Sequence, residues 1–145
     1  MKYVIYYWSR YGNGKKIVNA LSEKLKEKNA ETKIYNTEEA DPKSIPNADL
    51  YIFSAPAEAF NVQKNMRKFM KKLEGMEKKE YAIINTHGMK KKNWLGKMEK
   101  LLTKKDMVKI AELDYHVVDG YQTGNGLPKG WEEKLNQFTE KIWKN

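Results

Sequence analysis

The chain has 145 residues, contains no cysteine and carries a formal net charge of +9, from 28 Lys and Arg against 19 Asp and Glu. This length allows one domain over residues 1–145 to bury a sizeable core, and the lack of cysteine excludes disulfides, a thiol nucleophile and thiolate-held metals. No apolar run reaches the ~7–15 residues of a signal-peptide core or the ~20 of a membrane span, so we expect a cytoplasmic protein.

The excess of cations favours acidic partners, phosphorylated ligands or nonspecific binding of nucleic acid. The sequence has no arginine-rich segment, no aromatic RNA-binding signature and no helix-turn-helix spacing. We therefore expect no specific nucleic-acid partner. The lysines are scattered along the predicted helices, a pattern that is typical of a solvated helix face.

The first predicted strand covers residues 3–8, a continuous apolar and aromatic run of the kind that a parallel sheet buries on both faces. The loop Ser9-Arg10-Tyr11-Gly12-Asn13-Gly14 follows, and an amphipathic helix is expected from about Lys15 to about Asn29. A loop that turns directly into a helix leaves backbone N–H groups unpaired, and these groups can bind a phosphate. Glycines permit the close approach that this requires, although an ordinary strand-to-helix turn explains them equally well.

The remaining predicted elements continue the alternation of strands and helices. Strands are expected at 32–36, 48–53 and 81–85 and within 108–118, and amphipathic helices at 62–73, 94–102 and 131–142. Five strands alternating with helices predict an α/β fold, with one parallel sheet, right-handed crossovers and helices on both faces. In such sheets, ligands bind beyond the carboxyl ends of the strands, where the strand order reverses.

The first loop resembles that of flavodoxins, which reads Thr/Ser-x-Thr-Gly-Asn-Thr and wraps the phosphate of FMN. Ser9, Gly12 and Asn13 match this pattern, whereas Tyr11 and Gly14 replace hydroxyl residues. The resemblance covers essentially the whole chain. It implies a flavodoxin-like three-layer sandwich with a five-stranded parallel sheet in the order 2-1-3-4-5, and it implies FMN as the cofactor.

In flavodoxins, the loops that follow the third and fourth strands contact the flavin ring. The matching residues here are Pro56, Ala57, Glu58, Ala59, Phe60 and Asn61 after the third strand, and Thr86, His87 and Gly88 after the fourth. The resemblance implies that backbone groups of Ala57, Glu58 and Gly88 meet the polar edge of the ring. The Glu58 carboxylate either helps to keep the reduced flavin neutral or is simply solvated.

Aromatic and histidine side chains near these loops are further candidates for contact with the flavin. Phe60 is the preferred aromatic contact because it stands before a helix, whereas Trp94 fits the core at least as well. Tyr11 is a third candidate. His87 is a candidate hydrogen-bond or proton donor, and His116, in the fifth strand, is interpreted as structural.

Three functions are compatible with these residues. The first is an FMN-binding electron carrier that shuttles electrons between protein redox partners, which are expected to be acidic, and that needs no catalytic residue of its own. The second is an enzyme, an FMN-dependent reductase that oxidises NAD(P)H and reduces a quinone-type acceptor, but the chain has little spare length for a second nucleotide pocket. The third is a flavodoxin-fold module that has lost its flavin and binds another phosphorylated ligand or a protein. We rank the carrier first. The lysine run 90–92 is expected to raise the flavin potential, to dock an acidic partner or only to solubilise a helix start.

Overall fold

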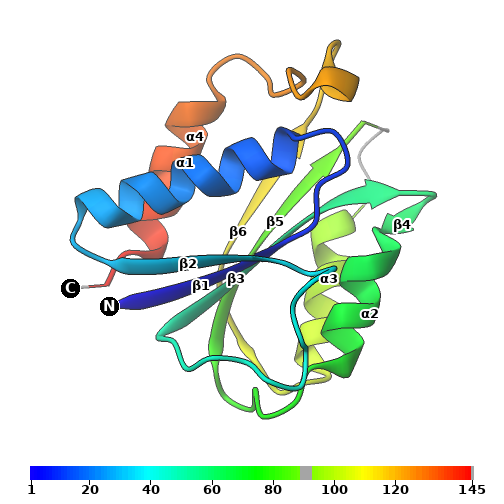
Figure 1. The fold of residues 1–145 in the computed structure, drawn as a ribbon. Helices are drawn as coiled ribbons and strands as arrows, with labels where there is room; N and C mark the ends of the chain where they lie inside the picture. Colours follow the sequence, from blue (N-terminus) through cyan, green and yellow to red (C-terminus); the bar gives the residue numbers. More distant parts are fainter. Residues whose placement is uncertain (89–92, 145) are drawn as a thin grey trace.

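The computed structural model describes residues 1–88 and 93–144, in which strands and helices alternate along the chain (Figure 1). The elements are β1 (Lys2–Tyr7), α1 (Asn13–Glu27), β2 (Glu31–Asn36), β3 (Leu50–Glu58), β4 (Asn61–Val62), α2 (Lys64–Lys72), β5 (Glu80–His87), α3 (Trp94–Thr103), β6 (Val108–His116), the short 3₁₀ helix η1 (Tyr121–Thr123) and α4 (Trp131–Ile142). Helix α1 starts two residues before the predicted position and also ends two residues earlier.

Five parallel strands form the main sheet in the order β2-β1-β3-β5-β6, and the short strand β4 pairs antiparallel with β3. The fourth and fifth predicted strands are β5 and β6, so the predicted order 2-1-3-4-5 is confirmed. Helices α1 and α4 cover one face of the sheet, and α2 and α3 cover the other (Figure 1). The predicted three-layer α/β fold is therefore confirmed.

The central strand β1 explains why its sequence is continuously apolar. Tyr3 and Ile5 pack in the core on the α1 and α4 side, whereas Val4 and Tyr6 pack in the core on the α2 and α3 side. Successive side chains of a strand point to opposite faces, and all four are at most 1% exposed. The sheet thus separates two cores, and both of its faces require apolar residues.

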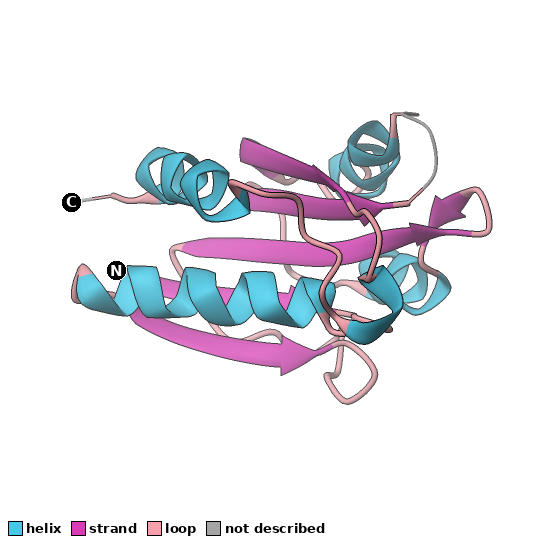
Figure 2. Cartoon of the chain, turned by 90° about the horizontal axis from the view of Figure 1, so that it is seen from above, coloured by secondary structure: helices cyan, strands magenta, loops and turns pink. Residues whose placement is uncertain are grey.

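Strand β3 is longer than predicted, because its second half continues to find pairing partners. Residues 54–56 pair with 84–86 of β5, and Ala57 and Glu58 pair with β4. The expected loop is therefore a hairpin, which extends beyond the neighbouring strands (Figure 2). At its tip, Ala59 and Phe60 have φ angles of 49° and 63°, which non-glycine residues adopt rarely.

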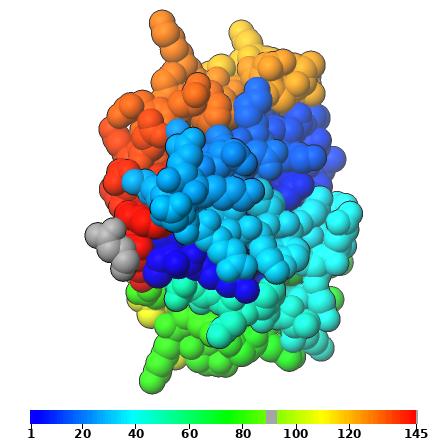
Figure 3. Space-filling model, turned by 60° about the vertical axis from the view of Figure 1, so that its left-hand side comes forward, coloured from blue at the N-terminus to red at the C-terminus, as the bar shows by residue number. Residues whose placement is uncertain are grey.

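The C-terminal part of the chain returns to the N-terminal part. The Tyr3 hydroxyl donates a hydrogen bond of 2.8 Å to the carbonyl oxygen of Ile142, which ties β1 to the end of α4. Residues 118–130 lie beside the start of α1 (Figure 3, yellow to orange beside blue). Among the described residues, no helix combines the length and the apolar character that crossing a membrane requires.

Candidate functional site

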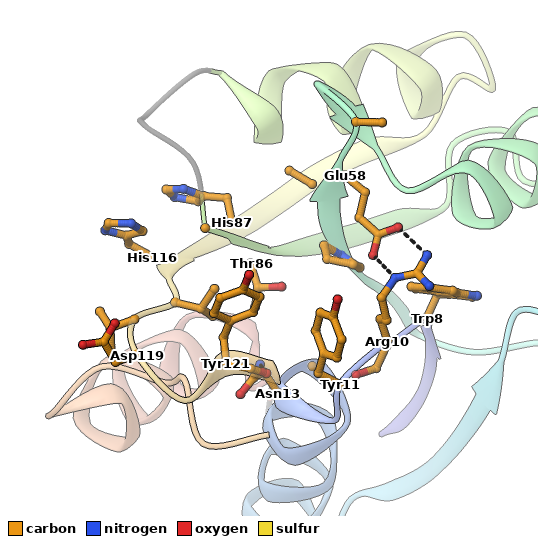
Figure 4. A pocket seen from close by; sticks show the side chains of 18 residues that line it. Trp8, Arg10, Tyr11, Asn13, Glu58, Thr86, His87, His116, Asp119 and Tyr121 are labelled. Atoms are coloured by element: carbon orange, nitrogen blue, oxygen red, sulfur yellow. Dashed lines mark hydrogen bonds and ion pairs between the residues drawn. The ribbon is translucent and has the colours of Figure 1, made fainter. Parts of the chain in front are cut away.

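A cavity of about 790 Å³ opens at the carboxyl ends of the parallel strands (Figure 4). Its walls are the segment after β1, the last residues of β3, β5 and β6 with the residues that follow them, the start of α1 and part of η1. Strands β1 and β3 are neighbours in the sheet, although β2 comes between them in the sequence. The cavity therefore lies where the strand order reverses. The volume falls within the roughly 300–1,000 Å³ that is common for ligand pockets.

The start of α1 forms one end of the cavity. Gly12 precedes the helix with a φ of 100°, and the helix has no side-chain cap and no carboxylate in its first turn. The Ser9 hydroxyl accepts a hydrogen bond of 3.1 Å from the Gly12 N–H, and Lys15 and Lys16 are exposed on the first turn. Unpaired helix N–H groups beside a hydroxyl and two cations are suited to binding a phosphate.

Asn13 holds this helix start against a loop that is distant in sequence. Its Nδ2 donates to the carbonyl oxygen of Tyr121 at 2.7 Å, and its Oδ1 accepts from the Gly126 N–H at 2.9 Å. Both polar atoms of the buried amide are thus engaged by the protein. At the same contact, a Cβ added to Gly124 would lie 2.9 Å from the Tyr11 carbonyl oxygen, so a glycine is required there.

Two tyrosine rings form an aromatic surface above the helix start. Tyr11 and Tyr121 pack edge to face, with ring centroids 5.6 Å apart and an interplanar angle of 75°. Both rings line the cavity and point into it (Figure 4). Their exposed fractions of 42% and 39% leave large ring areas that can contact a planar ligand.

An ion pair joins the loop after β1 to the end of β3. The Arg10 guanidinium donates to both carboxylate oxygens of Glu58, from Nε at 2.7 Å and from Nη2 at 2.8 Å. This hydrogen bond raises the pKa of Arg10, and the guanidinium also lies 5.0 Å from the centre of the Trp8 ring. Because the Arg10 side chain is 49% exposed, the pair contributes only about 0–1 kcal/mol to stability. The pair links two walls of the cavity.

Two histidines stack on the opposite wall. The rings of His87 and His116 are nearly parallel, at 8°, with centroids 5.2 Å apart. Nε2 of the buried His87 lies 2.8 Å from Oδ2 of Asp114, which fixes the orientation of the ring. Within residues 1–88 and 93–144, no group of three or more His, Asp or Glu side chains could hold a metal ion. Both imidazole rings line the cavity.

Comparison with known proteins identifies the family. The model of the flavodoxin domain matches residues 4–116, which is most of the chain. The chain belongs to the flavodoxin domain family. No curated protein matches it in sequence.

Solved structures of flavodoxins show the same fold. A flavodoxin from the domain Archaea aligns with a TM-score of 0.72 and 15% identity, over 97% of this chain and 93% of that chain. The solution structure of two-electron reduced Megasphaera elsdenii flavodoxin gives 0.72 and 15%, over 98% and 100%. The rubredoxin oxygen:oxidoreductase of Desulfovibrio gigas gives 0.78 and 16%, but only 35% of that longer chain is covered. At these identities, the likeness concerns the fold.

Twelve of the sixteen predicted site residues line the cavity of this flavodoxin domain. They are Ser9, Arg10, Tyr11, Asn13 and Gly14 of the first loop, residues 56–59 at the end of β3 and residues 86–88 at the end of β5. Ala57, Glu58 and Gly88 lie at the cavity wall, and their contact with a flavin ring stays a prediction. The lysine run 90–92 lies outside the described residues.

The other four predicted residues do not line the cavity. Gly12 faces Gly124 of the segment after β6, and Asn61 belongs to β4. Phe60, at the hairpin tip, is 65% exposed, and Trp94, at the start of α3, is 1% exposed. The hairpin pairing places Phe60 outside the cavity wall and burial removes Trp94 from it, so Tyr11 is the one predicted aromatic contact that the cavity retains.

Sequence reasoning missed the segment that follows β6. His116, Tyr121 and residues 117–119 line the cavity, and the interpretation of His116 as purely structural is corrected by its exposed position there. Trp8, at the end of β1, was also missed. The available signal was positional, because the residues that follow the fifth parallel strand reach the same edge of the sheet as the other loops.

Proposed function

We propose that this flavodoxin domain binds FMN and transfers electrons between redox partners. The observation that carries the proposal is a single cavity in which a phosphate-binding helix start adjoins a wall of aromatic and histidine side chains. The family assignment supports a flavin as the ligand. The helix start and the Ser9 hydroxyl described above support FMN, because they suit its phosphate.

The two ends of the cavity match the two ends of FMN. The uncapped first turn of α1, the Ser9 hydroxyl and the nearby lysines suit a phosphate dianion. The rings of Tyr11 and Tyr121 offer aromatic surface for a planar ring system, and residues 57–58 and 88 bring backbone donors and acceptors to the wall.

Bound FMN would supply the electron chemistry, because flavins accept and release electrons readily. The chain's task is to bind the cofactor, orient it and adjust its surroundings. The first turn of α1 and Ser9 would hold the phosphate, and the Arg10–Glu58 pair would keep the loop after β1 and the end of β3 in place. The contact between His87 Nε2 and Asp114 would hold the imidazole ring in one orientation at the cavity wall.

Titration with FMN and with riboflavin, followed by quenching of flavin fluorescence, tests this proposal. Charge-assisted hydrogen bonds to the phosphate contribute about 1.5–3 kcal/mol, so we expect FMN to bind about 10–100 times more tightly than riboflavin. Equal affinities, or no binding at micromolar FMN, would contradict the proposal. With bound flavin, reversible reduction by dithionite and no bleaching by NAD(P)H are expected of a carrier, whereas direct bleaching by NAD(P)H would indicate a reductase.

A second candidate is a module that binds a different phosphorylated ligand. It is favoured by Asn13, because both polar atoms of this amide, which belongs to the flavodoxin-like loop pattern, are already bonded to Tyr121 and Gly126. Under this alternative, the helix start still binds a phosphate while the flavin ring adds no affinity. Inorganic phosphate would then displace FMN from the protein at concentrations typical of a simple anion site.

A further inference from the structure

The excess positive charge of the chain is concentrated on one helical layer. Helix α2 carries five cations and no carboxylate, and α3 with the two residues after it carries four cations and one carboxylate, Glu99. Glu99 pairs with Lys109 of β6. Within residues 1–88 and 93–144, no ion pair includes any of the nine helix cations. They are Lys64, Arg67, Lys68, Lys71, Lys72, Lys97, Lys100, Lys104 and Lys105.

The opposite layer is nearly balanced. Helix α1 carries four lysines and two glutamates, and α4 carries two lysines and three glutamates. Ion pairs also form there, between Lys26 and Glu23 and between Lys28 and Glu140. Both layers cover a face of the same sheet, so solubility alone gives no reason to place the excess charge on one of them.

The β3–β4 hairpin connects the cationic layer to the cavity. Ala57 and Glu58 line the cavity, and the chain then turns at Phe60 and enters α2 at Lys64. Phe60 is 65% exposed, and Lys97 of α3 donates a hydrogen bond of 3.2 Å to its carbonyl oxygen. Figure 1 shows the hairpin next to α2 and α3. An exposed aromatic side chain, a residue type that is enriched at protein interfaces, thus stands beside a cluster of cations.

We infer that an acidic redox protein docks on the basic face, which we define as the outer side of α2 and α3 together with the hairpin tip at Phe60. The inference rests on the proposed function, because it assigns the partner of the same cavity. Carboxylates of the partner meet the unpaired cations, and an apolar spot on it covers the Phe60 ring. Docking there brings the partner's redox centre to the edge of the cavity, beside the residues at the end of β3.

The surface favours a protein over the other polyanions. Single-stranded nucleic acid needs several aromatic platforms along a basic groove, whereas the basic face carries one exposed aromatic residue. An anionic membrane is bound most strongly when several large apolar side chains accompany the lysines, and Phe60 is the one such exposed side chain in α2, α3 and the hairpin. Because the hairpin joins this face to the proposed flavin cavity, we infer a partner that exchanges electrons with the flavin.

Two charge-matched triple variants test the docking surface. Lys64→Gln/Lys68→Gln/Lys71→Gln removes three charges from the basic face, and Lys24→Gln/Lys26→Gln/Lys141→Gln removes three from the opposite layer. The probe is reduced plant-type [2Fe–2S] ferredoxin, chosen for its negative charge, which donates one electron to the bound flavin and is itself oxidised. The rate constant is followed by stopped flow at the flavin absorption band.

We expect the α2 variant to lower the second-order rate constant about tenfold, because each exposed charge pair is worth about 0.2–1 kcal/mol, and the control to lower it less than about twofold. Phe60→Ala is expected to lower the rate constant without changing its salt dependence. Equal losses in the two triple variants would show that net charge, and not this face, guides the partner, and would overturn the inference.

A second measurement does not depend on the flavin. Oxidised ferredoxin is added to the flavin-free protein, and amide NMR shifts are mapped onto the fold, with changes expected in α2, α3 and residues 57–62. Shifts confined to other elements, or tighter binding of duplex DNA or of phosphatidylserine vesicles to the same residues, overturn the inference. If FMN fails to bind while these shifts appear, the proposed function fails and the docking surface stands.

Discussion

Replacing Asn13 by alanine removes both hydrogen bonds that hold residues 120–126 against the start of α1. The lost bonds are the 2.7 Å donation to the Tyr121 carbonyl and the 2.9 Å bond accepted from the Gly126 N–H. A typical hydrogen bond contributes about 0.5–1.5 kcal/mol, and a buried group left without a partner costs about 1–3 kcal/mol. The Gly126 bond is buried, so we expect the free energy of unfolding to fall by about 2–4 kcal/mol.

Urea unfolding followed by far-UV circular dichroism measures this loss. The matched control is Asn19→Ala, an exposed position on the same helix, where alanine's higher helix propensity should leave stability unchanged or slightly raised. Hydrogen exchange of the amides in residues 120–126 should accelerate in Asn13→Ala and not in the control. Asn13→Asp should be intermediate, because it keeps the acceptor for Gly126 and loses the donor to Tyr121.

A loss of less than about 0.5 kcal/mol in Asn13→Ala, relative to Asn19→Ala, would refute this reasoning, since ordinary surface substitutions change stability by that amount. Unchanged exchange of residues 120–126 would do the same. Either result would mean that the loop is held in place by its other contacts and that Asn13 is free to serve a ligand.

Three further predictions concern the loop, the core and the response to pH. Gly124→Ala should cost about 1–2 kcal/mol through its φ of 78°, and it should weaken FMN binding in the fluorescence titration, because the added methyl would lie 2.9 Å from the Tyr11 carbonyl. Ile17→Ala, at a fully buried position, should lower the free energy of unfolding by about 2–5 kcal/mol in the urea assay, and a smaller loss would contradict the packing described. Burial raises the pKa of Tyr81 to about 12, so stability should be fully present below its ordinary pKa of 10.0 and should fall as the pH rises toward 12. Tyr81→Phe should flatten that decline in unfolding curves measured across this pH range.

Much of the site was predictable because it depends on features local in sequence. The loop 9–14 lies between an apolar strand and an amphipathic helix, and parallel strands deliver their following loops to one edge of the sheet. That reasoning found the walls after β1, β3 and β5. It did not extend to the segment after β6, although the same rule places His116 and Tyr121 at the edge.

The rest depended on contacts that no spacing pattern shows. The bond between Asn13 and Gly126 joins residues 113 positions apart, and the sequence around Asn13 fits a ligand contact equally well. Phe60 lies outside the cavity wall because the chain turns back at Ala59 and Phe60, which have positive φ angles. This turn pairs Ala57 with Val62 and leaves Phe60 at the tip of the hairpin. The sequence does not distinguish a loop aromatic residue that faces a cavity, as Tyr11 does, from one that faces solvent, as Phe60 does.

The contact between Asn13 and Gly126 also determines when the proposed FMN site can form during synthesis. The loop proposed to bind the phosphate leaves the ribosome before Gly126, which lies 113 residues after Asn13, a delay of roughly 6–20 s at about 5–20 residues per second. The wall after β6 and the Tyr3 bond to Ile142 arrive in the same late interval. A nascent chain therefore exposes an unfinished pocket, and capture of the proposed cofactor should begin only after residues 116–142 have emerged.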